Sequence, residues 1–410
     1  MTPQASVVIV SRGRGPELAR CLLSLEFQTC PRFEVIVVGD RAAQQAVVAG
    51  PGLARVGFAP FEAANIAAAR NAGVAAARAP VVAFLDDDAV AEPCWLAGLI
   101  AALQVPGVGL AAGYVRGPDG LAFQWRGEWL TPDGLSRPMT PVPEVPGHVF
   151  AQDGAVPGAM GTNFAVAAKA LRAVGGFDAR FRYFLDESDL VLRLAAAGQG
   201  VAYAPRAQVH HSLAPGPYRR ADRLPRSLVA VGRSAALFAA THAPDAVADA
   251  VAAHRERQRM RLVRAMVAGR CLPDQVWSLL RSFDRGVAQA NRVPVPPPET
   301  SFEKAGRLFS QDAAARNASA GAVEAVWLIA QGRGDPCAFA AAERAAEAGG
   351  VATVVIPAGR LSRPQVVFRA PGLWLHNLPL SKRQMTANRH VLDHLQAEYS
   401  DIRVGNHVRI

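Results

Sequence analysis

Three consecutive carboxylates, Asp86, Asp87 and Asp88, directly follow the apolar run PVVAFL at residues 80–85. Like charges this close repel one another, and each resists leaving water unless a positive partner is near. One interpretation is a solvated turn in which an aspartate caps the next helix. The other is a site for a divalent cation that carries a phosphorylated substrate. The triplet alone leaves both interpretations open.

The first third of the chain alternates short apolar strands with Ala- and Leu-rich helices. We expect strands at residues 6–10, 33–40 and 80–85, and helices at 16–28 and 62–78. Continuous apolar strands separated by helices are typical of a parallel sheet that is covered on both faces. Ligands bind beyond the carboxyl ends of such strands. Ser11, Asp40 and the aspartate triplet follow three of these ends, which favours the cation site.

Further along the chain, Gly, Pro and aromatic residues dominate residues 113–160, which we expect to form loops and antiparallel edge strands. We then expect helices at 167–174 and 187–197, and a strand near 200–204 that leads to His210 and His211. Four regions follow from this pattern: a first domain at 1–215, a helical extension at 216–291, a stiff Pro-rich linker at 292–300 and a small α/β region at 301–410.

Composition narrows the class of protein. Half of the 410 residues are apolar, which supports sizeable cores. The five cysteines show no CxxC spacing, so we expect a reducing, cytosolic compartment. No apolar stretch reaches the ~18–20 residues that cross a bilayer. The formal charge of +10 favours anionic partners. However, heavy use of Ala and Arg is also typical of a genomic bias, so the net charge is weak evidence of function. We expect no nucleic acid among the partners.

Two common phosphate-binding loops are excluded by the sequence. Gly13-x-Gly15 and Gly332-x-Gly334 each lack the third glycine of GxGxxG, and no GxxxxGK[ST] is present. What remains is a phosphate site built on a metal ion held by carboxylates. Mg²⁺ and Mn²⁺ take one or two protein carboxylates and complete their shell with phosphates and water. Asp86 and Asp88, at D-x-D spacing, suit that role.

Three segments occur in a characteristic order: VVIVSRGRGPELARCLLSLEFQTCPRFEVIVVGD, NIAAARNAGVAAARAPVVAFLDDDAVAEPCWL and GTNFAVAAKALRAVGGFDARFRYFLDESDLVLRLAAAGQGVAYAPRAQVHH. Together they resemble the family 2 glycosyltransferases of the GT-A fold over about residues 5–215. The resemblance implies an α/β fold with a Rossmann-like mixed sheet. It also implies inverting transfer of a sugar from a nucleotide-diphosphate donor to a hydroxyl acceptor, with Mg²⁺ or Mn²⁺ as cofactor.

The resemblance further implies roles for individual residues. The residues that would contact the nucleotide sugar are Ser11, Arg12, Asp40, Arg70, Asp86 and Asp87. Those that would hold the metal are Asp88, Asp86 and His211. Glu187 would be the general base and Asp186 would meet the acceptor, although Asp186-Glu187 reverses the usual order of the two acids. Inverting transfer needs both a base at the acceptor hydroxyl and charge neutralisation at the departing diphosphate. We expect Asp189 and Arg193 to be a structural i,i+4 pair.

Other functions stay open at this point. A sugar-phosphate nucleotidyltransferase would share the sheet architecture, and a non-catalytic module could bind nucleotide sugars without turnover. The segment HRERQRMRLVRAMVAGR at 254–270 predicts either a basic amphipathic helix on an anionic membrane or a helix packed on the catalytic domain. We expect a glycan or glycolipid acceptor and a role in envelope polysaccharide or glycolipid assembly. The expected location is the cytoplasm or the inner face of the membrane.

Overall fold

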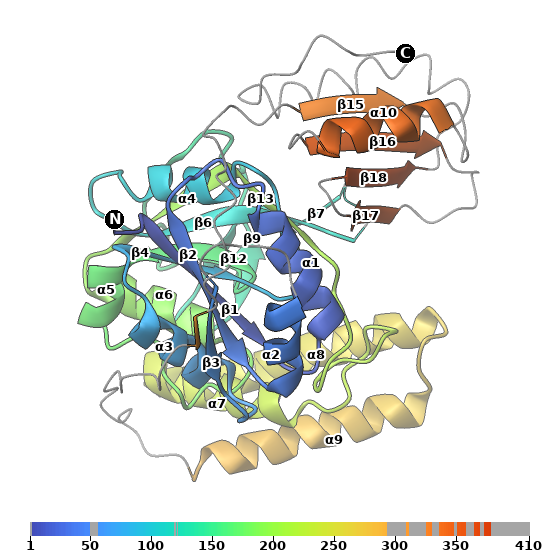
Figure 1. Cartoon of the computed structure of the whole chain (residues 1–410). Helices are drawn as coiled ribbons and strands as arrows, with labels where there is room; N and C mark the ends of the chain where they lie inside the picture. The colour runs from blue at the N-terminus through green and yellow to red at the C-terminus, as the bar shows by residue number, and fades with distance from the viewer. Residues whose placement is uncertain are drawn as a thin grey trace.

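A mixed β-sheet forms the centre of the N-terminal half of the protein. The computed structural model describes residues 2–49, 56–118, 120, 122–292, 309–310, 325–329, 336–347, 351–357, 365–369 and 373–378. Four parallel strands lie in the order β4-β1-β2-β3 (Figure 1). Their bounds are Ala5–Ser11 for β1, Phe33–Gly39 for β2, Val56–Pro60 for β3 and Val81–Leu85 for β4. The predicted strands at 6–10, 33–40 and 80–85 are confirmed.

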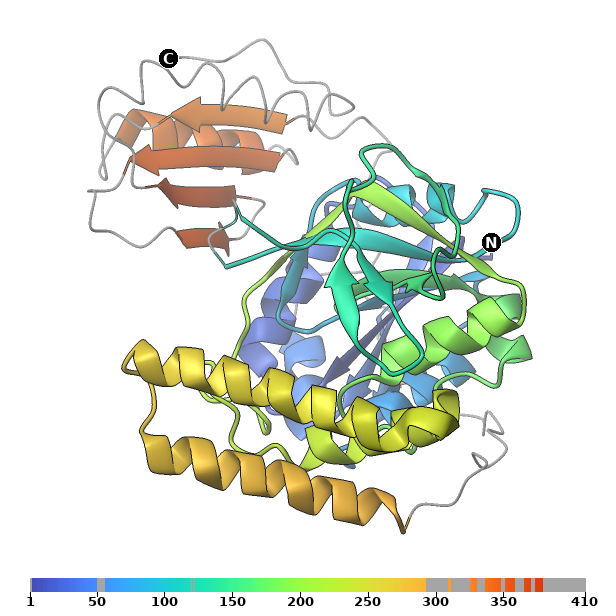
Figure 2. The same ribbon diagram turned by 180° about the vertical axis from the view of Figure 1, so that it is seen from behind.

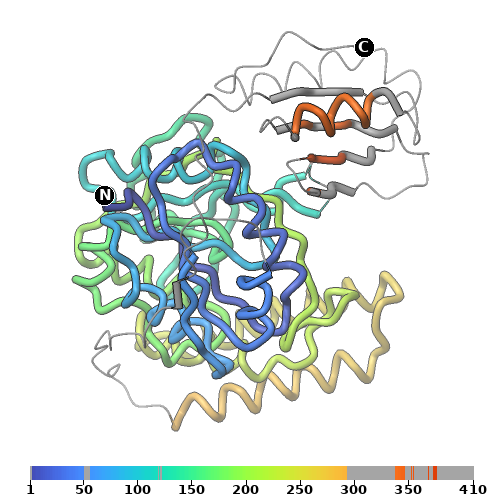
Figure 3. Tube along the Cα trace, viewed as in Figure 1, coloured from blue at the N-terminus to red at the C-terminus, as the bar shows by residue number. Residues whose placement is uncertain are grey.

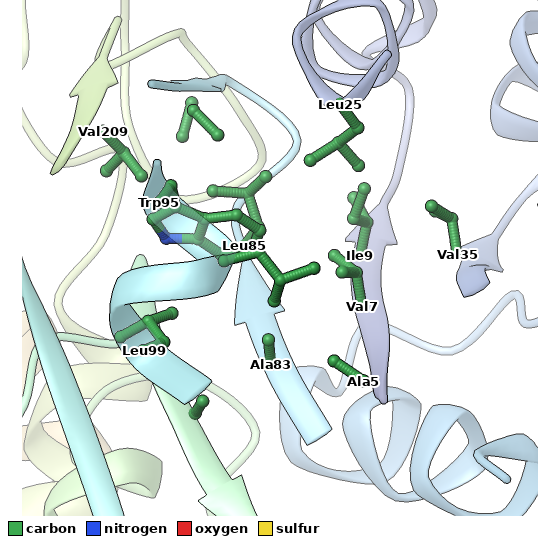
Figure 4. Packing of buried hydrophobic residues seen from close by; sticks show 14 of the residues in the cluster. Ala5, Val7, Ile9, Leu25, Val35, Ala83, Leu85, Trp95, Leu99 and Val209 are labelled. Atoms are coloured by element: carbon green, nitrogen blue, oxygen red, sulfur yellow. The ribbon is translucent and has the colours of Figure 1, made fainter. Parts of the chain in front are cut away.

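Helices cover both faces of these parallel strands. Their bounds are Gly15–Leu25 for α1, Arg41–Ala49 for α2, Ile66–Ala76 for α3, Trp95–Ala102 for α4, Ala168–Ala173 for α5 and Asp186–Ala196 for α6. Helices α1 and α4 pack on one face, and α3 and α6 pack on the other. Because successive side chains of a strand point to opposite faces, Val7 and Ile9 of β1 enter the first core and Val8 enters the second. Figure 4 shows Val7 and Ile9 in the first core together with Leu25 of α1 and Trp95 of α4.

The other half of the sheet is mixed. Beyond β4 the order continues with β12 (Asn163–Ala167), β6 (Val108–Arg116), β13 (Gly200–His211) and β10 (Gly147–Val149). Strand β12 is antiparallel to both neighbours, whereas β13 is parallel to β6. Two short strands pair at the side, β5 (Ala89–Ala91) with β13 and β7 (Phe123–Trp125) with β6. A separate small sheet consists of β11 (Val156–Pro157), β8 (Glu128–Leu130) and β9 (Ser136–Pro138).

Two predictions about this half are wrong. Residues 113–116 belong to β6, a buried strand in the middle of the sheet, and not to loops or edge strands. A Cβ on Gly113 would lie 2.1 Å from the carbonyl oxygen of Ala207, so this glycine marks a close backbone approach and not a turn. Strand β13 also continues past residue 204 to His211, after a bulge between Ala204 and Gln208.

A helical layer follows the sheet. Its helices are α7 (Val229–His242), η1 (Pro244–Ala246), α8 (Val247–Val267) and α9 (Pro273–Ala290). Helices occur from Val229 onward, as the sequence predicts for this region, but residues 216–228 contain no helix. Helices α7 and α9 approach closely through two glycines: a Cβ on Gly232 would lie 2.2 Å from the Phe283 carbonyl oxygen, and one on Gly286 would lie 2.1 Å from that of Val229.

Segment 254–270 packs as a helix. Its buried side is formed by His254, Gln258, Leu262 and Ala265, which belong to α8. This supports the interpretation of a helix packed on its neighbours. Within the described ranges, none of the helices combines the length and hydropathy that crossing a bilayer requires.

A second, smaller sheet lies in the C-terminal region (Figures 1 and 2). It has the order β15 (Ala325–Ile329), β16 (Val351–Pro357), β18 (Leu373–Leu378) and β17 (Gln365–Arg369), with α10 (Pro336–Glu347) between β15 and β16. The predicted β-α-β unit is confirmed, since β15 and β16 are parallel. Strand β14 (Phe309–Ser310), which also follows residue 300, pairs with β3 of the large sheet. The predicted linker at 292–300 lies outside the described residues apart from Arg292.

Candidate active site

The aspartate triplet occupies the turn between β4 and β5, where the amide of Ala89 donates to the carbonyl of Asp86 over 3.1 Å. Strand β5 pairs with the end of β13, with Ala89 opposite His211. The sheet thus brings His211 to the triplet from more than a hundred residues along the chain. The structure confirms that the carboxylates follow a buried strand.

Three potential metal ligands meet at this turn. One atom each of Asp86, Asp88 and His211 lies within 4.8 Å of the others. His211 Nε2 is 3.3 Å from Asp88 Oδ1 and 4.0 Å from Asp86 Oδ2. His211 Nδ1 lies 3.1 Å from Gln124 Oε1 and donates to it, so the ring presents Nε2 to the two carboxylates.

The two carboxylates are fixed by further hydrogen bonds. Thr162 Oγ1 donates to Asp86 Oδ2 over 2.7 Å, and the Ala214 amide donates to Asp88 Oδ2 over the same distance. Burial alone would raise the pKa of Asp88, but the hydrogen bond and charge of His211 and the charge of Arg14 lower that pKa well below its usual range. Two oxygens and one imidazole nitrogen in fixed positions suit Mg²⁺ or Mn²⁺. The residues present therefore fit a divalent cation.

Asp87 faces the protein interior. Its exposed fraction is 0%, so it has no surface to offer a ligand. Arg14 Nη2 lies 2.6 Å from Asp87 Oδ1, and Arg14 Nη1 lies 3.3 Å from Asp88 Oδ2. Burial raises the pKa of Asp87 to about 7, against the opposing charge of Arg14. In this geometry Asp87 anchors Arg14 beside the metal ligands, and its burial argues against the direct contact with the nucleotide sugar that the sequence had predicted.

Arg70 connects the metal ligands to a second acidic pair. This side chain of α3 is buried, with Nη1 2.6 Å from Asp186 Oδ2 and Nη2 3.7 Å from Asp86 Oδ1. Nη2 also donates to the carbonyl of Gly161 over 2.7 Å. Its guanidinium lies over three aromatic rings, those of Phe84, Phe164 and Phe177, with centroids 5.5 to 5.9 Å away.

Asp186 and Glu187 begin α6 after an unusual turn. Phe184 and Leu185 both have positive φ, 74° and 65°, a region that side chains with a Cβ rarely enter. Such strain is concentrated at functional sites. Burial raises the pKa of Glu187 to about 8, the neighbouring charge of Asp186 adds to the increase, and Arg70 opposes it. A carboxyl group with this pKa is matched to proton transfer near neutral pH.

The expected pair of Asp189 and Arg193 is confirmed at 2.6 Å, and His242 Nε2 of α7 lies 2.9 Å from the other oxygen of Asp189. These contacts hold α6 against α7, so Asp189 and Arg193 are structural.

The contacts of Asp40 are structural as well. Its oxygens accept the amides of Gly13 at 2.8 Å and Ala43 at 3.0 Å, which ties the turn after β1 to the end of β2. Ser11 is buried at that turn, and Arg12 is exposed.

Two arginines beside the metal ligands were missed by the sequence analysis. Arg14 belongs to the SRGRG run, but no spacing rule predicts its contact with Asp87. Arg219 comes from the loop at 212–228, which Figure 3 traces from β13 toward α7, and its Nη2 lies 3.9 Å from Asp88 Oδ2. Nearby, Tyr218 of the same loop stacks on Tyr183 with centroids 4.0 Å apart. No sequence motif marks this loop.

A model of a known protein family matches much of the N-terminal half of the chain. Residues 6–175 match the family model described as "Glycosyl transferase family 2". This match supports the resemblance that the three sequence segments indicated. The family match and the mixed α/β sheet together confirm the predicted GT-A fold.

One curated relative is the O-antigen biosynthesis protein RfbC of Myxococcus xanthus, which is 29% identical over 249 residues. The match covers 55% of this chain but only 18% of the relative, so the chain spans less than a fifth of that protein's length.

Three solved structures are similar in outline. GalNAc-T7 with UDP, GalNAc and Mn²⁺ has a TM-score of 0.43 at 16% identity, covering 58% of this chain and 48% of that one. The mannosyltransferase PcManGT of Pyrobaculum calidifontis, in complex with GDP-Man and Mn²⁺, has a TM-score of 0.40 at 16% identity, and the match covers 71% of this chain and 88% of that one. TarS of S. aureus has a TM-score of 0.41 at 14% identity, and the match covers 58% of this chain and 40% of that one.

Proposed function

We propose that the protein is a metal-dependent, inverting glycosyltransferase that moves a sugar from a nucleotide-diphosphate donor to a hydroxyl acceptor. The observation that carries the proposal is the link, through buried Arg70, between the cluster of Asp86, Asp88 and His211 and the acidic pair at the start of α6. The match of residues 6–175 to the family 2 model supports it. We infer that the catalytic domain is residues 1–215, with the helical extension, linker and C-terminal region bounded as the sequence predicted.

The donor side is assigned to the cluster at the β4–β5 turn. Asp86, Asp88 and His211 would hold Mg²⁺ or Mn²⁺, and such a cation neutralises the charge of a leaving diphosphate when it is bound. Arg14 and Arg219 add fixed positive charge at the same place, since both guanidinium groups face Asp88. Arg12, exposed on the turn that Asp40 positions, remains a predicted donor contact, as does Ser11 beneath it.

The acceptor side is assigned to Glu187. Its carboxylate takes the proton of the acceptor hydroxyl as that oxygen bonds to the anomeric carbon of the sugar. The bond from this carbon to the phosphate oxygen breaks on the opposite face, and the nucleoside diphosphate leaves with the electron pair, so the configuration inverts. Asp186 is buried against Arg70, so it orients the start of α6 and raises the pKa of Glu187. Its predicted contact with the acceptor stays a prediction.

A thermal-shift screen of nucleotide sugars with Mn²⁺, followed by product analysis, would identify the donor sugar and its nucleotide base. We expect release of nucleoside diphosphate, and its loss in Glu187→Gln while the donor still binds. Pyrophosphate as product would identify a nucleotidyltransferase instead. Donor binding without any turnover would identify a non-catalytic module. Near-normal turnover by Glu187→Gln would remove Glu187 from the mechanism.

For the acceptor, we propose a glycan or glycolipid of envelope polysaccharide assembly, with action in the cytoplasm or at the inner face of the membrane. The name of the curated relative, an O-antigen biosynthesis protein, supports this role. Transfer of radiolabelled sugar into a lipid-extractable or polymeric fraction tests it.

A further inference from the structure

We propose that the tip of the α8–α9 hairpin, residues 267–277, docks on an anionic phospholipid surface. Three large apolar side chains are exposed there: Val267 at 80%, Leu272 at 63% and Trp277 at 72%. They account for three of the seven exposed large hydrophobic residues in the part of the chain that the structure describes. Exposed apolar residues that gather in one place mark interaction sites, whereas scattered ones need no explanation.

The charge around the tip matches an anionic surface. Residues 260–281 include four arginines and a single acid, Asp274, and the four are all exposed: Arg261, Arg264, Arg270 and Arg281. The neighbouring loop adds three exposed arginines, Arg220, Arg223 and Arg226. Basic residues around an apolar face that includes a tryptophan are typical of segments that lie in the membrane interface.

Hydrogen bonds define the backbone at both helix ends of the tip. Helix α8 ends in a Schellman motif, in which the amides of Gly269 and Arg270 donate to the carbonyls of Met266 and Ala265. Leu272 is the N-cap of helix α9, and its amide donates to Gln275 Oε1 over 2.9 Å. Between them Cys271 is buried, which turns its neighbours outward.

The tip lies beside the loop at 212–228 (Figures 1 and 2). Leu224 of this loop packs in one core with Leu262 and Cys271, and Arg261 donates to the carbonyl of Arg223 over 3.3 Å. The other end of the loop donates to Asp88 through the Ala214 amide. The loop at 212–228 therefore connects the tip to the metal ligands. That a membrane under the tip would present a lipid-linked acceptor to this site rests on the proposed function; membrane binding itself does not.

Charge complementarity favours lipid over the other occupants. In a two-fold dimer the same patch faces itself, so the arginines of two copies would repel one another. Nucleic acid would use the arginines but would leave the three apolar side chains against a charged backbone.

Vesicle co-sedimentation of the full chain, without donor or acceptor, tests the proposal. The vesicles are phosphatidylcholine alone, or equal parts phosphatidylcholine and phosphatidylglycerol. We expect at least about tenfold stronger binding to the anionic vesicles, weakened by salt. The variant Val267→Ser/Leu272→Ser/Trp277→Ser should lose at least about tenfold of that binding. Serine is a favoured N-cap, so Leu272→Ser preserves the start of α9.

The matched control is Val145→Ser/Phe150→Ser, which removes two side chains that are each 72% exposed but lie outside the hairpin. It should bind vesicles like the parent, and all three proteins should share one Tm. Equal binding by parent and triple variant would overturn the proposal, as would no binding to anionic vesicles. A parent that dimerises through the tip, or that binds a DNA oligonucleotide but no vesicle, would assign the tip to another occupant. Turnover of a soluble acceptor by the triple variant separates this outcome from failure of the proposed function.

Discussion

Replacing Arg70 by methionine should destabilise the N-terminal domain strongly. Arg70 is 4% exposed, and its Nη1 pairs at 2.6 Å with Asp186, which is 3% exposed. Methionine keeps an unbranched stem among the aromatic rings that surround Arg70, but it leaves the Asp186 carboxylate buried without its cation. Removing one partner of a buried ion pair costs about 3–5 kcal/mol.

That free energy converts into a large thermal shift. For a domain of about 150–250 residues, each 1 kcal/mol lowers Tm by about 2–4 °C, so Arg70→Met should lower Tm by roughly 6–20 °C. The assay is thermal unfolding at neutral pH, followed by circular dichroism. Arg259→Met, which breaks the exposed pair with Glu256, is the matched control and should melt like the parent.

A double-mutant cycle identifies the cause. Asp186→Asn removes the buried charge, so adding it to Arg70→Met should cost less than the sum of the two single changes. A Tm for Arg70→Met within about 2 °C of the parent would refute the reasoning that this pair is buried and closely paired. Additive effects in the cycle would show that the loss comes from packing and not from the unpaired carboxylate.

Three further outcomes are expected. First, kcat/KM should rise with pH toward a plateau above about 8, because the base must be ionised and burial raises the pKa of Glu187 to about 8; a pH–rate profile that is flat through this region contradicts the assignment. The same raised pKa means that protonated Glu187 stabilises the folded state at low pH. This contribution to stability is lost as the pH rises from the usual pKa of a glutamate to about 8. Second, Gln124→Leu should weaken Mn²⁺ binding about 10–100-fold by calorimetry, since it removes the acceptor that orients His211; unchanged affinity would mean that Gln124 does not orient the ligand. Third, Gly232→Ala should lower Tm although alanine is the better helix former, because its Cβ would lie 2.2 Å from the Phe283 carbonyl oxygen; a raised Tm would mean that α7 and α9 are further apart.

The local features of the site could be predicted from the sequence. The strand that ends at Leu85 and the triplet after it are contiguous, so hydrophobic pattern and charge identify them without any tertiary information. The first turn of α6 is equally local, because the acids of DESD stand together at its start. The family resemblance then supplied the order of these segments.

What could not be predicted depends on contacts between distant segments. Arg14 and Arg219 reach the triplet only because the sheet and the loop after β13 bring them there, across 73 and 131 residues of chain. The burial of Asp87 is also tertiary, since the sequence does not show which of three adjacent carboxylates faces inward. Strand β6 was missed because its glycines, which permit close backbone approach at Gly113, are typical of loops as well.

Calorimetry of the metal-stripped protein with nucleoside diphosphates tests most directly whether the two acidic centres divide the work. We predict binding that requires Mn²⁺ or Mg²⁺, is lost in Asp88→Ala and is retained in Glu187→Gln. Equal binding without a cation, or loss of binding in Glu187→Gln with no effect of Asp88→Ala, would contradict the account.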